Sequence, residues 1–259
     1  PIPLAGGEIR MFSRVRNELL RLPWLLDFYR SQGVDRFFIV DNGSDDGSRD
    51  YLLDRPDTHL FLTTDSYAVY GGGMRWLNHL LNRYGSGGWC LTVDVDEVLA
   101  YPHAERLGLA ALTAHLDRQG ARALFAFMLD MYAEDCLTRV GYQAGDDPIA
   151  TCPCFDRSGY VRREHPDFPF RMVSGGLVSR VFYDGKQDGV YLHKVPLVRW
   201  EEGLHYTSST HTLFPVPLAV ETGVLLHLKY RADFIDRARI ESQRKQYWLA
   251  VSTNHGPLC

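Results

Sequence analysis

The feature that most constrains the fold is a regular alternation of short apolar strands and amphipathic helices over the first hundred residues. The pattern predicts strands near residues 8–15, 37–40, 59–63 and 89–94, with helices over 18–32, 48–54 and 74–84 between them. Connections this short favour parallel βαβ units. We therefore expect an α/β fold, in which a mostly parallel, doubly wound sheet is flanked by helices in a single domain.

Composition and charge exclude several classes of protein. The chain has 259 residues, of which 45% are hydrophobic and 23% charged, which is ordinary for a globular protein. A net charge of -4 argues against nucleic-acid binding, which usually needs a basic stripe. No apolar run approaches the ~20 residues of a membrane helix. Five cysteines, few and odd in number, favour reduced thiols in a cytoplasmic protein.

The second half of the chain is less regular. It predicts strands over residues 123–131, 190–198 and 224–230, and a long loop over 145–170. A charged helix is expected from Arg231 to about Val251. We expect this helix to dock on the domain, although its amphipathic pattern also suits peripheral contact at the inner face of a membrane.

Acidic residues follow two of the predicted strands. Asp41 ends the second strand, and Asp94, Asp96 and Glu97 follow the fourth. The carboxyl ends of parallel strands form the ligand-binding edge of such a sheet, so these acids are expected in one crevice. Because alternate strand residues share a face, Asp94 and Asp96 are expected to project together, about 6.6 Å apart. Such a pair suits Mg²⁺ or Mn²⁺, which also bind substrate phosphates.

Three motifs occur in a fixed order in this half: Arg16-Asn17-Glu18, the turn over residues 40–48, and Asp94-Val95-Asp96. Together they resemble the nucleotide-binding half of the family 2-like glycosyltransferases, which have the GT-A, Rossmann-like fold. Further motifs resemble a bacterial subgroup related to family 92-type glycosyltransferases: Ser174-Gly175-Gly176 with Arg180, His193-Lys194 and Leu226-His227-Leu228-Lys229. The resemblance implies one GT-A-like domain over residues 1–259, with a nucleotide-binding half at 8–100 and an acceptor-binding half at 101–259.

The resemblance also implies a function. A sugar would pass from a nucleoside-diphosphate donor, with a UDP-sugar favoured, to a saccharide or glycolipid acceptor in surface-polysaccharide assembly. Asp41 would contact the base, and Arg75 the nucleotide. Asp94 would face the ribose and join Asp96 at the Mn²⁺ or Mg²⁺ ion. The other residues expected at the nucleotide are Arg16, Asn17, Arg180, Lys194 and Lys229.

His227 lies in an apolar strand, two residues before Lys229 and on the same face. One interpretation makes His227 a third metal ligand, with Lys229 as a point charge on the diphosphate. The alternative interpretation is a hydrogen-bonded core histidine. His211, at the end of a segment rich in threonine and serine, is the rival ligand.

The general base is not marked by a motif, because no Glu-Asp pair follows at the spacing usual in inverting enzymes of the family. The candidates are Asp130, Glu201, Glu202 and Asp188. Asp130 is preferred because it lies at a strand end and is able to reach the same crevice, and Glu202 is the second choice.

Two other functions fit the pattern. A nucleotidyltransferase also uses acidic metal ligands on an α/β sheet, but the first strand is not followed by a glycine-rich and basic phosphate-binding turn. A non-catalytic nucleotide-sugar-binding module of a larger polysaccharide-assembly protein is the third hypothesis. The reaction products would separate the three hypotheses. A glycosyltransferase releases a nucleoside diphosphate, a nucleotidyltransferase releases pyrophosphate, and a binding module releases neither.

Overall fold

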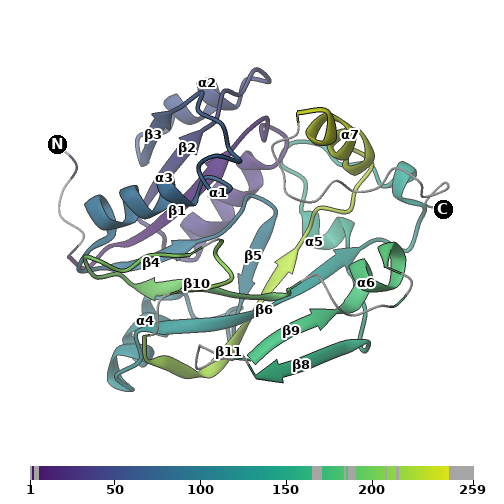
Figure 1. Cartoon of the computed structure of the whole chain (residues 1–259). Helices are drawn as coiled ribbons and strands as arrows, with labels where there is room; N and C mark the ends of the chain where they lie inside the picture. The colour runs from purple at the N-terminus through teal and green to yellow at the C-terminus, as the bar shows by residue number, and fades with distance from the viewer. Residues whose placement is uncertain are drawn as a thin grey trace.

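The computed structural model of the chain describes residues 2, 6–164, 171–183, 185, 191–207, 209–213 and 216–244 (Figure 1). The first half contains β1 (Ile9–Val15), α1 (Leu22–Ser31), β2 (Arg36–Asp41), α2 (Ser48–Leu53), β3 (Thr58–Leu62), α3 (Met74–Leu80), the π-helical turn η1 (Leu81–Gly85), β4 (Trp89–Thr92) and β5 (Glu97–Ala100). The second half contains α4 (Leu109–Arg118), β6 (Ala123–Tyr132), the 3-10 turn η2 (Leu137–Arg139), α5 (Pro148–Thr151), β7 (Cys154–Phe155), β8 (Tyr160–Glu164), β9 (Arg171–Gly175), α6 (Gly176–Phe182), β10 (His193–Arg199), β11 (Leu218–His227) and α7 (Phe234–Arg244).

One large sheet joins strands from both halves in the order β3-β2-β1-β4-β10-β6-β11-β5, with β7 added beside β6 (Figure 1). β3, β2, β1 and β4 are mutually parallel, and β6 is parallel to β11. β10 runs against both of its neighbours, and β5 runs against β11. The predicted α/β fold with a mostly parallel sheet is confirmed. The division into a nucleotide half and an acceptor half stays a prediction.

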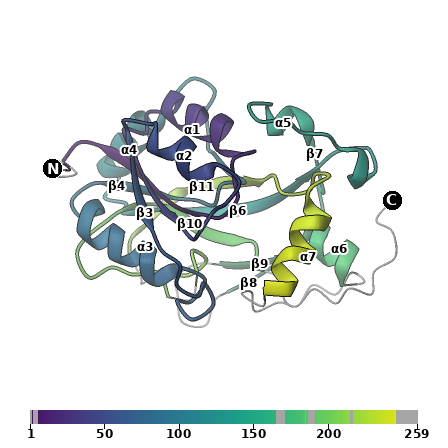
Figure 2. The same ribbon diagram turned by 90° about the horizontal axis from the view of Figure 1, so that it is seen from above.

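Successive side chains of β1 pack into two apolar cores, one on each face of the sheet. Met11 packs in the core that includes Leu22 and Leu25 of α1. Phe12 packs in the other core, with Met74 and Leu77 of α3. Successive strand residues point to opposite faces, so one strand serves both layers. Figure 2 shows α1 and α3 on opposite sides of the strands.

Two element predictions are wrong, and one strand was not predicted. β4 ends at Thr92 rather than at residue 94, because residues 94–97 form a turn in which the amide of Glu97 donates to the carbonyl of Asp94 (3.0 Å). The reversal makes residues 97–100 a separate edge strand, β5, paired with β11. The described part of the predicted loop over 145–170 contains α5, β7 and β8.

The terminal helix α7 is docked, as expected, on the loop after β1. Arg237 donates to Glu18 (3.1 Å), and Asp233, just before the helix, accepts from Arg21 (2.6 Å). Within the described residues, no helix combines the length and the apolarity that crossing a membrane requires. Peripheral membrane contact stays a prediction, and the part of the expected helix beyond residue 244 is outside the described residues.

The cysteines differ in state. Cys90, Cys152 and Cys154 are free thiols. Cys136 is disulfide-bonded, so the prediction that all five thiols are reduced is wrong for this residue. Spacing in the sequence gave no indication of this bond, because no regular cysteine framework is present.

Candidate functional site

The loops after β1 and β2 are joined by hydrogen bonds between backbone amides and side chains. The first loop donates from Asn17 N to Ser44 Oγ (2.9 Å), from Glu18 N to Ser48 Oγ (2.8 Å) and from Leu19 N to Asp46 Oδ2 (3.0 Å). The Asn17 side chain donates to the Asp45 carboxylate (2.8 Å) and accepts from its amide (2.9 Å). The backbone of Asn17 is left-handed (φ 54°), a conformation that asparagine tolerates better than most residues. Asn17 therefore holds the two loops together, and its side chain is occupied there.

Asp41 lies at the carboxyl end of β2 with one oxygen unused. The side chain is buried, and its Oδ1 accepts from the amide of Ser44 (2.8 Å). Its Oδ2 is buried and has no hydrogen-bond partner among the described residues. Arg16, expected at the nucleotide, donates to the carbonyl of Asn42 in the same loop. A buried oxygen without a partner is costly, so Asp41 is the best-placed acceptor for a ligand donor at this edge.

The turn over residues 94–97 separates the two aspartates. Since β2 and β4 are both parallel to β1, the turn lies at the same edge of the sheet as Asp41, as predicted. The expectation that Asp94 and Asp96 project from one strand face is wrong, because the strand has already ended. Asp94 contacts Lys194 and Arg14, whereas Asp96 contacts His227.

Asp94, whose side chain is 34% exposed, contacts a buried ion pair formed by Lys194 and Glu97. Lys194 Nζ donates to Asp94 Oδ2 (3.0 Å) and to Glu97, and Arg14 Nη2 lies 3.3 Å from Asp94 Oδ1. Glu97 in turn accepts from the amide of Asp94 (3.0 Å). Burial raises the pKa of the Asp94 carboxyl, but Lys194 and Arg14 outweigh it and hold that pKa below its ordinary value. Both oxygens of Asp94 are thus paired with cations, and Lys194, 4% exposed, supports Asp94 rather than a phosphate.

His227 links two carboxylates. Its Nδ1 is 2.7 Å from Asp130 Oδ1, and its Nε2 is 3.6 Å from Asp96 Oδ2. Asp130 and His227 are direct neighbours across the parallel pair of β6 and β11. Burial and Lys229 oppose a charge on the imidazole, but Asp96 and Asp130 raise its pKa to about 9. Asp130 is buried and engaged, so it orients His227 and is not placed as a free general base.

Asp96 and His227 fit one side of a divalent cation site. Two ligands that are each about 2.1 Å from an ion lie no more than about 4.2 Å apart, and 3.6 Å satisfies this limit. The carboxylate behind His227 is the usual second-shell partner of a metal-bound histidine. Within the described ranges, no group of three or more His, Cys, Asp or Glu side chains is placed to hold a metal. The remaining ligands would come from substrate oxygens and water.

Other predicted residues lie apart from this cluster. Arg180 forms a two-pronged ion pair with Asp156 (2.9 Å for both bonds). Glu202 is exposed and follows β10, whose Arg199 pairs with Trp89 at the start of β4. It therefore lies at the opposite edge of the sheet from Asp94 and Asp96. Asp188 is outside the described residues.

Arg75 and Lys229, both predicted at the nucleotide, each lie against a tyrosine ring. Arg75 is exposed, with its guanidinium carbon 5.9 Å from the ring centre of Tyr70. The Lys229 ammonium lies 5.1 Å from the ring centre of Tyr230. The contacts of both residues with the nucleotide stay predictions.

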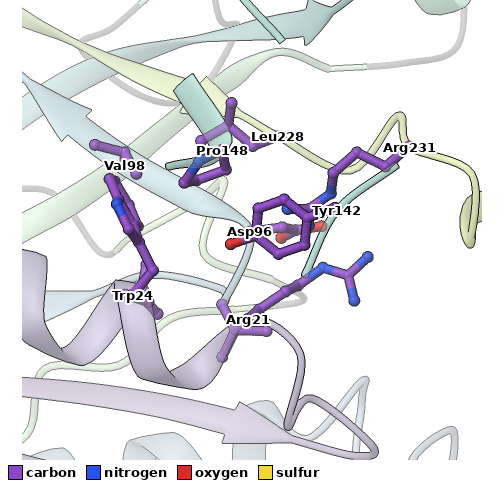
Figure 3. A pocket seen from close by; sticks show the side chains of 10 residues that line it. Arg21, Trp24, Asp96, Val98, Tyr142, Pro148, Leu228 and Arg231 are labelled. Carbon is purple, nitrogen blue, oxygen red and sulfur yellow. The ribbon is translucent and has the colours of Figure 1, made fainter. Parts of the chain in front are cut away.

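Sequence reasoning missed several residues of the site. Arg14 donates to the hydroxyl of Tyr67 (3.0 Å) as well as contacting Asp94. Its position on β1, on the same face as Phe12, was the only available signal. Arg21 and Arg231 line a recess beside Asp96, shown in Figure 3. Nothing in their local sequence distinguishes these arginines from the other arginines of the chain.

Comparison with known proteins assigns no family. No protein-family model matches the chain, and no curated protein matches it. The crystal structure of 4-diphosphocytidyl-2C-methyl-D-erythritol synthase is similar at 11% identity and a TM-score of 0.37, over 76% of this chain and 75% of that one. HddC from Yersinia pseudotuberculosis is similar at 10% identity and a TM-score of 0.39, over 88% of this chain and 96% of that one. The resemblance to glycosyltransferases stays a prediction.

Proposed function

We propose that the chain is a transferase that binds a nucleoside-diphosphate sugar at the carboxyl edge of β2 and β4 and transfers the sugar to a saccharide or glycolipid acceptor. The observation that carries this proposal is the unpartnered Oδ2 of buried Asp41 at the same sheet edge as Asp96 and His227. A base N–H would satisfy that oxygen, and a metal at Asp96 and His227 would receive the diphosphate.

The divalent cation, Mn²⁺ or Mg²⁺, would be held by Asp96 Oδ2 and His227 Nε2, with Asp130 fixing the ring of His227. Bound there, the cation would neutralise charge on the departing nucleoside diphosphate. Asp94, kept ionised by Lys194 and Arg14, is proposed as the acceptor of a ribose hydroxyl. Lys229 adds a mobile positive charge next to the phosphates.

Replacing Asp41 with asparagine is expected to weaken nucleoside-diphosphate binding by about 1–3 kcal/mol, the cost of leaving a buried group unpaired. The asparagine oxygen keeps the bond from Ser44 N, while its amide group replaces the free oxygen. Calorimetric titration measures the affinity, and thermal unfolding provides the control. Unchanged affinity, or a large fall in melting temperature, would remove Asp41 from the base site.

Replacing His227 with alanine is expected to raise the manganese concentration that half-saturates activity, and excess manganese should restore part of that activity. His211→Ala is the matched control. In the wild-type chain, the Nδ1–H of His211 donates to the carbonyl of His193 (2.6 Å), and burial and Lys194 lower the pKa of His211 to about 3. We expect an unchanged manganese midpoint for His211→Ala. A shift in His211→Ala alone, or in neither variant, would refute the proposed ligand.

Nucleotidyl transfer is the second candidate, and the two similar solved structures are too distant to decide the question. One feature of the site disfavours it. The backbone amides of Asn17, Glu18 and Leu19, in the loop after β1, already donate to side chains of the neighbouring loop. They are therefore not free to cradle the phosphates of a nucleoside triphosphate.

Product analysis separates the hypotheses. The purified chain is incubated with Mn²⁺ and either a panel of nucleotide sugars with a cell-derived acceptor, or nucleoside triphosphates with sugar phosphates. Release of a nucleoside diphosphate in the first mixture supports glycosyl transfer, and pyrophosphate in the second supports nucleotidyl transfer. Metal-dependent binding without either product would indicate a binding module.

A further inference from the structure

The recess in Figure 3 lies between the start of α1 and the second half of the chain. The recess is partly open to solvent, and its enclosed part has room for about one water-sized group. Its polar wall consists of Arg21, Asp96, Tyr142 and Arg231. The apolar wall is formed by Trp24, Leu25, Val95, Val98, Pro148 and Leu228. A ligand here would place an apolar part against one wall and a polar group against the other.

Arg231 brings an unmatched donor set to this recess. The residue is 1% exposed, and its Nε and Nη1 are buried without hydrogen-bond partners. Its guanidinium carbon lies 4.0 Å from the ring centre of Tyr142. Burial lowers the pKa of Arg231, which reflects the cost of keeping this charge away from water. Among the described residues, no carboxylate forms an ion pair with Arg231, so its Nε–H and Nη1–H are left without an acceptor, and an oxyanion would satisfy them.

The neighbouring arginine is in a different situation. Arg21 is matched by two carboxylates, at 3.3 Å from Glu18 and 2.6 Å from Asp233. Asp96 faces His227, whose Nε2 lies 3.6 Å from its Oδ2. Only the guanidinium of Arg231 is therefore left to draw an anion into the described part of the recess.

The recess is separate from the region proposed for the nucleotide. Asp94 and Arg14 lie with Tyr67 and Met74, on the α3 side of the sheet. The recess is on the α1 side, and one part of its lining, formed by Tyr142, Pro148, Leu228 and Arg231, belongs to the half of the chain expected to bind the acceptor. The rest of the lining belongs to residues 8–100. Asp96 lines the recess, so a group bound there would be adjacent to the proposed metal.

We propose that Arg231 is the anion-binding residue of the acceptor subsite, and that the acceptor is acidic, with a carboxylate or a phosphate next to its accepting hydroxyl. This inference rests on the proposed function, because it assigns the second substrate of the same site. The unpartnered Nε–H and Nη1–H of Arg231 lie on different edges of the planar guanidinium, so each offers its own charge-assisted hydrogen bond to an oxyanion, and the Tyr142 ring fixes the plane.

The test uses three probes in metal-free buffer: glucuronate, glucose 1-phosphate and neutral glucose. Calorimetric titration into the wild-type chain is expected to show at least one anionic probe binding about tenfold or more tightly than glucose, because charge-assisted hydrogen bonds are worth that much. Preference for glucuronate would assign a sugar acid, and preference for glucose 1-phosphate a phosphorylated acceptor. Equal binding of all three probes, or none, would overturn the proposal.

Variants locate the anion. Arg231→Gln should reduce the preference for the anionic probe about tenfold or more, and Arg231→Lys should keep part of it. Arg55→Gln is the matched control, because Arg55 also stacks on a tyrosine, with its guanidinium carbon 4.2 Å from the ring centre of Tyr51. Should Arg231→Gln fail to fold, Tyr142→Leu removes the ring that fixes the guanidinium and should weaken anion binding. Unchanged binding in the folded variants, or equal loss in Arg55→Gln, would overturn the proposal.

A separate titration with nucleoside diphosphate and Mn²⁺ distinguishes this inference from the proposed function. Arg231→Gln should bind nucleotide and metal as the wild-type chain does. If Arg231→Gln bound the nucleotide more weakly than the wild-type chain, Arg231 would belong to the donor site and the acceptor assignment would be refuted. Absence of nucleotide binding in the wild-type chain, with the anion preference intact, would refute the proposed function alone.

Discussion

Replacing Lys194 with methionine is expected to destabilise the fold by about 3–5 kcal/mol, the usual cost of removing one partner from a buried ion pair. The ammonium contacts both Asp94 and Glu97, and the side chains of Lys194 and Glu97 are 4% and 1% exposed. Methionine fills a similar volume but leaves two carboxylates close together in a buried site. A urea titration monitored by circular dichroism measures the free energy of unfolding of each variant.

Lys229→Met is the matched control. Lys229 is half-buried, and its ammonium contacts the ring of Tyr230, a contact worth about 0.5–1 kcal/mol at such a site. We expect Lys229→Met to lower the free energy of unfolding by less than about 1 kcal/mol. Similar losses in the two variants would mean that the carboxylates around Lys194 are neutral or solvated in the folded chain, contrary to the arrangement described.

Replacing Asp96 with asparagine is expected to abolish the effect of Mn²⁺ on nucleoside-diphosphate affinity. Asp96 is the sole carboxylate placed beside His227 Nε2 in the described residues, and a neutral amide is a weaker ligand for a hard cation. The measurement is a pair of calorimetric titrations, with manganese and with chelator. The wild-type chain should bind more tightly with manganese, and the variant should bind equally in both.

Asp156→Asn serves as the control for Asp96, because it removes a carboxylate that pairs with Arg180 instead. Its response to manganese should equal that of the wild-type chain. If Asp96→Asn retained the full manganese effect, the metal would have to be held by other groups, and the proposed site would be wrong.

The local sequence pattern was sufficient to predict strands β1 to β4 in the first half of the chain. Strands β1 to β4 follow the predicted alternation, and Asp41 lies at the expected edge. Periodicity and turn residues are local properties of the sequence, and single crossovers join β1 to β2 and β2 to β3, which pair as neighbours. The turn after β4 was missed because the apolar residues on both sides of Asp94 to Glu97 look like one continuous strand.

The charged contacts of the site could not be predicted from pattern. His227 meets Asp130 because β11 lies parallel to β6, and Lys194 meets Asp94 because β10 is inserted beside β4. Both contacts depend on strand order in the second half, where neighbouring strands are far apart in the chain. The sequence indicated which residues carry charge, and the topology determined which carboxylate each cation neutralises.

The hydrogen bonds between the loops after β1 and β2 also limit which amino-acid substitutions the two loops tolerate. Three amides of one loop depend on Ser44, Ser48 and Asp46 of the other, so neither loop works with an arbitrary partner. Grafting one loop alone would leave these donors unpaired, at about 1–3 kcal/mol for each buried group. Sequence changes at the two loops are therefore coupled, and an engineered exchange would have to move both loops together.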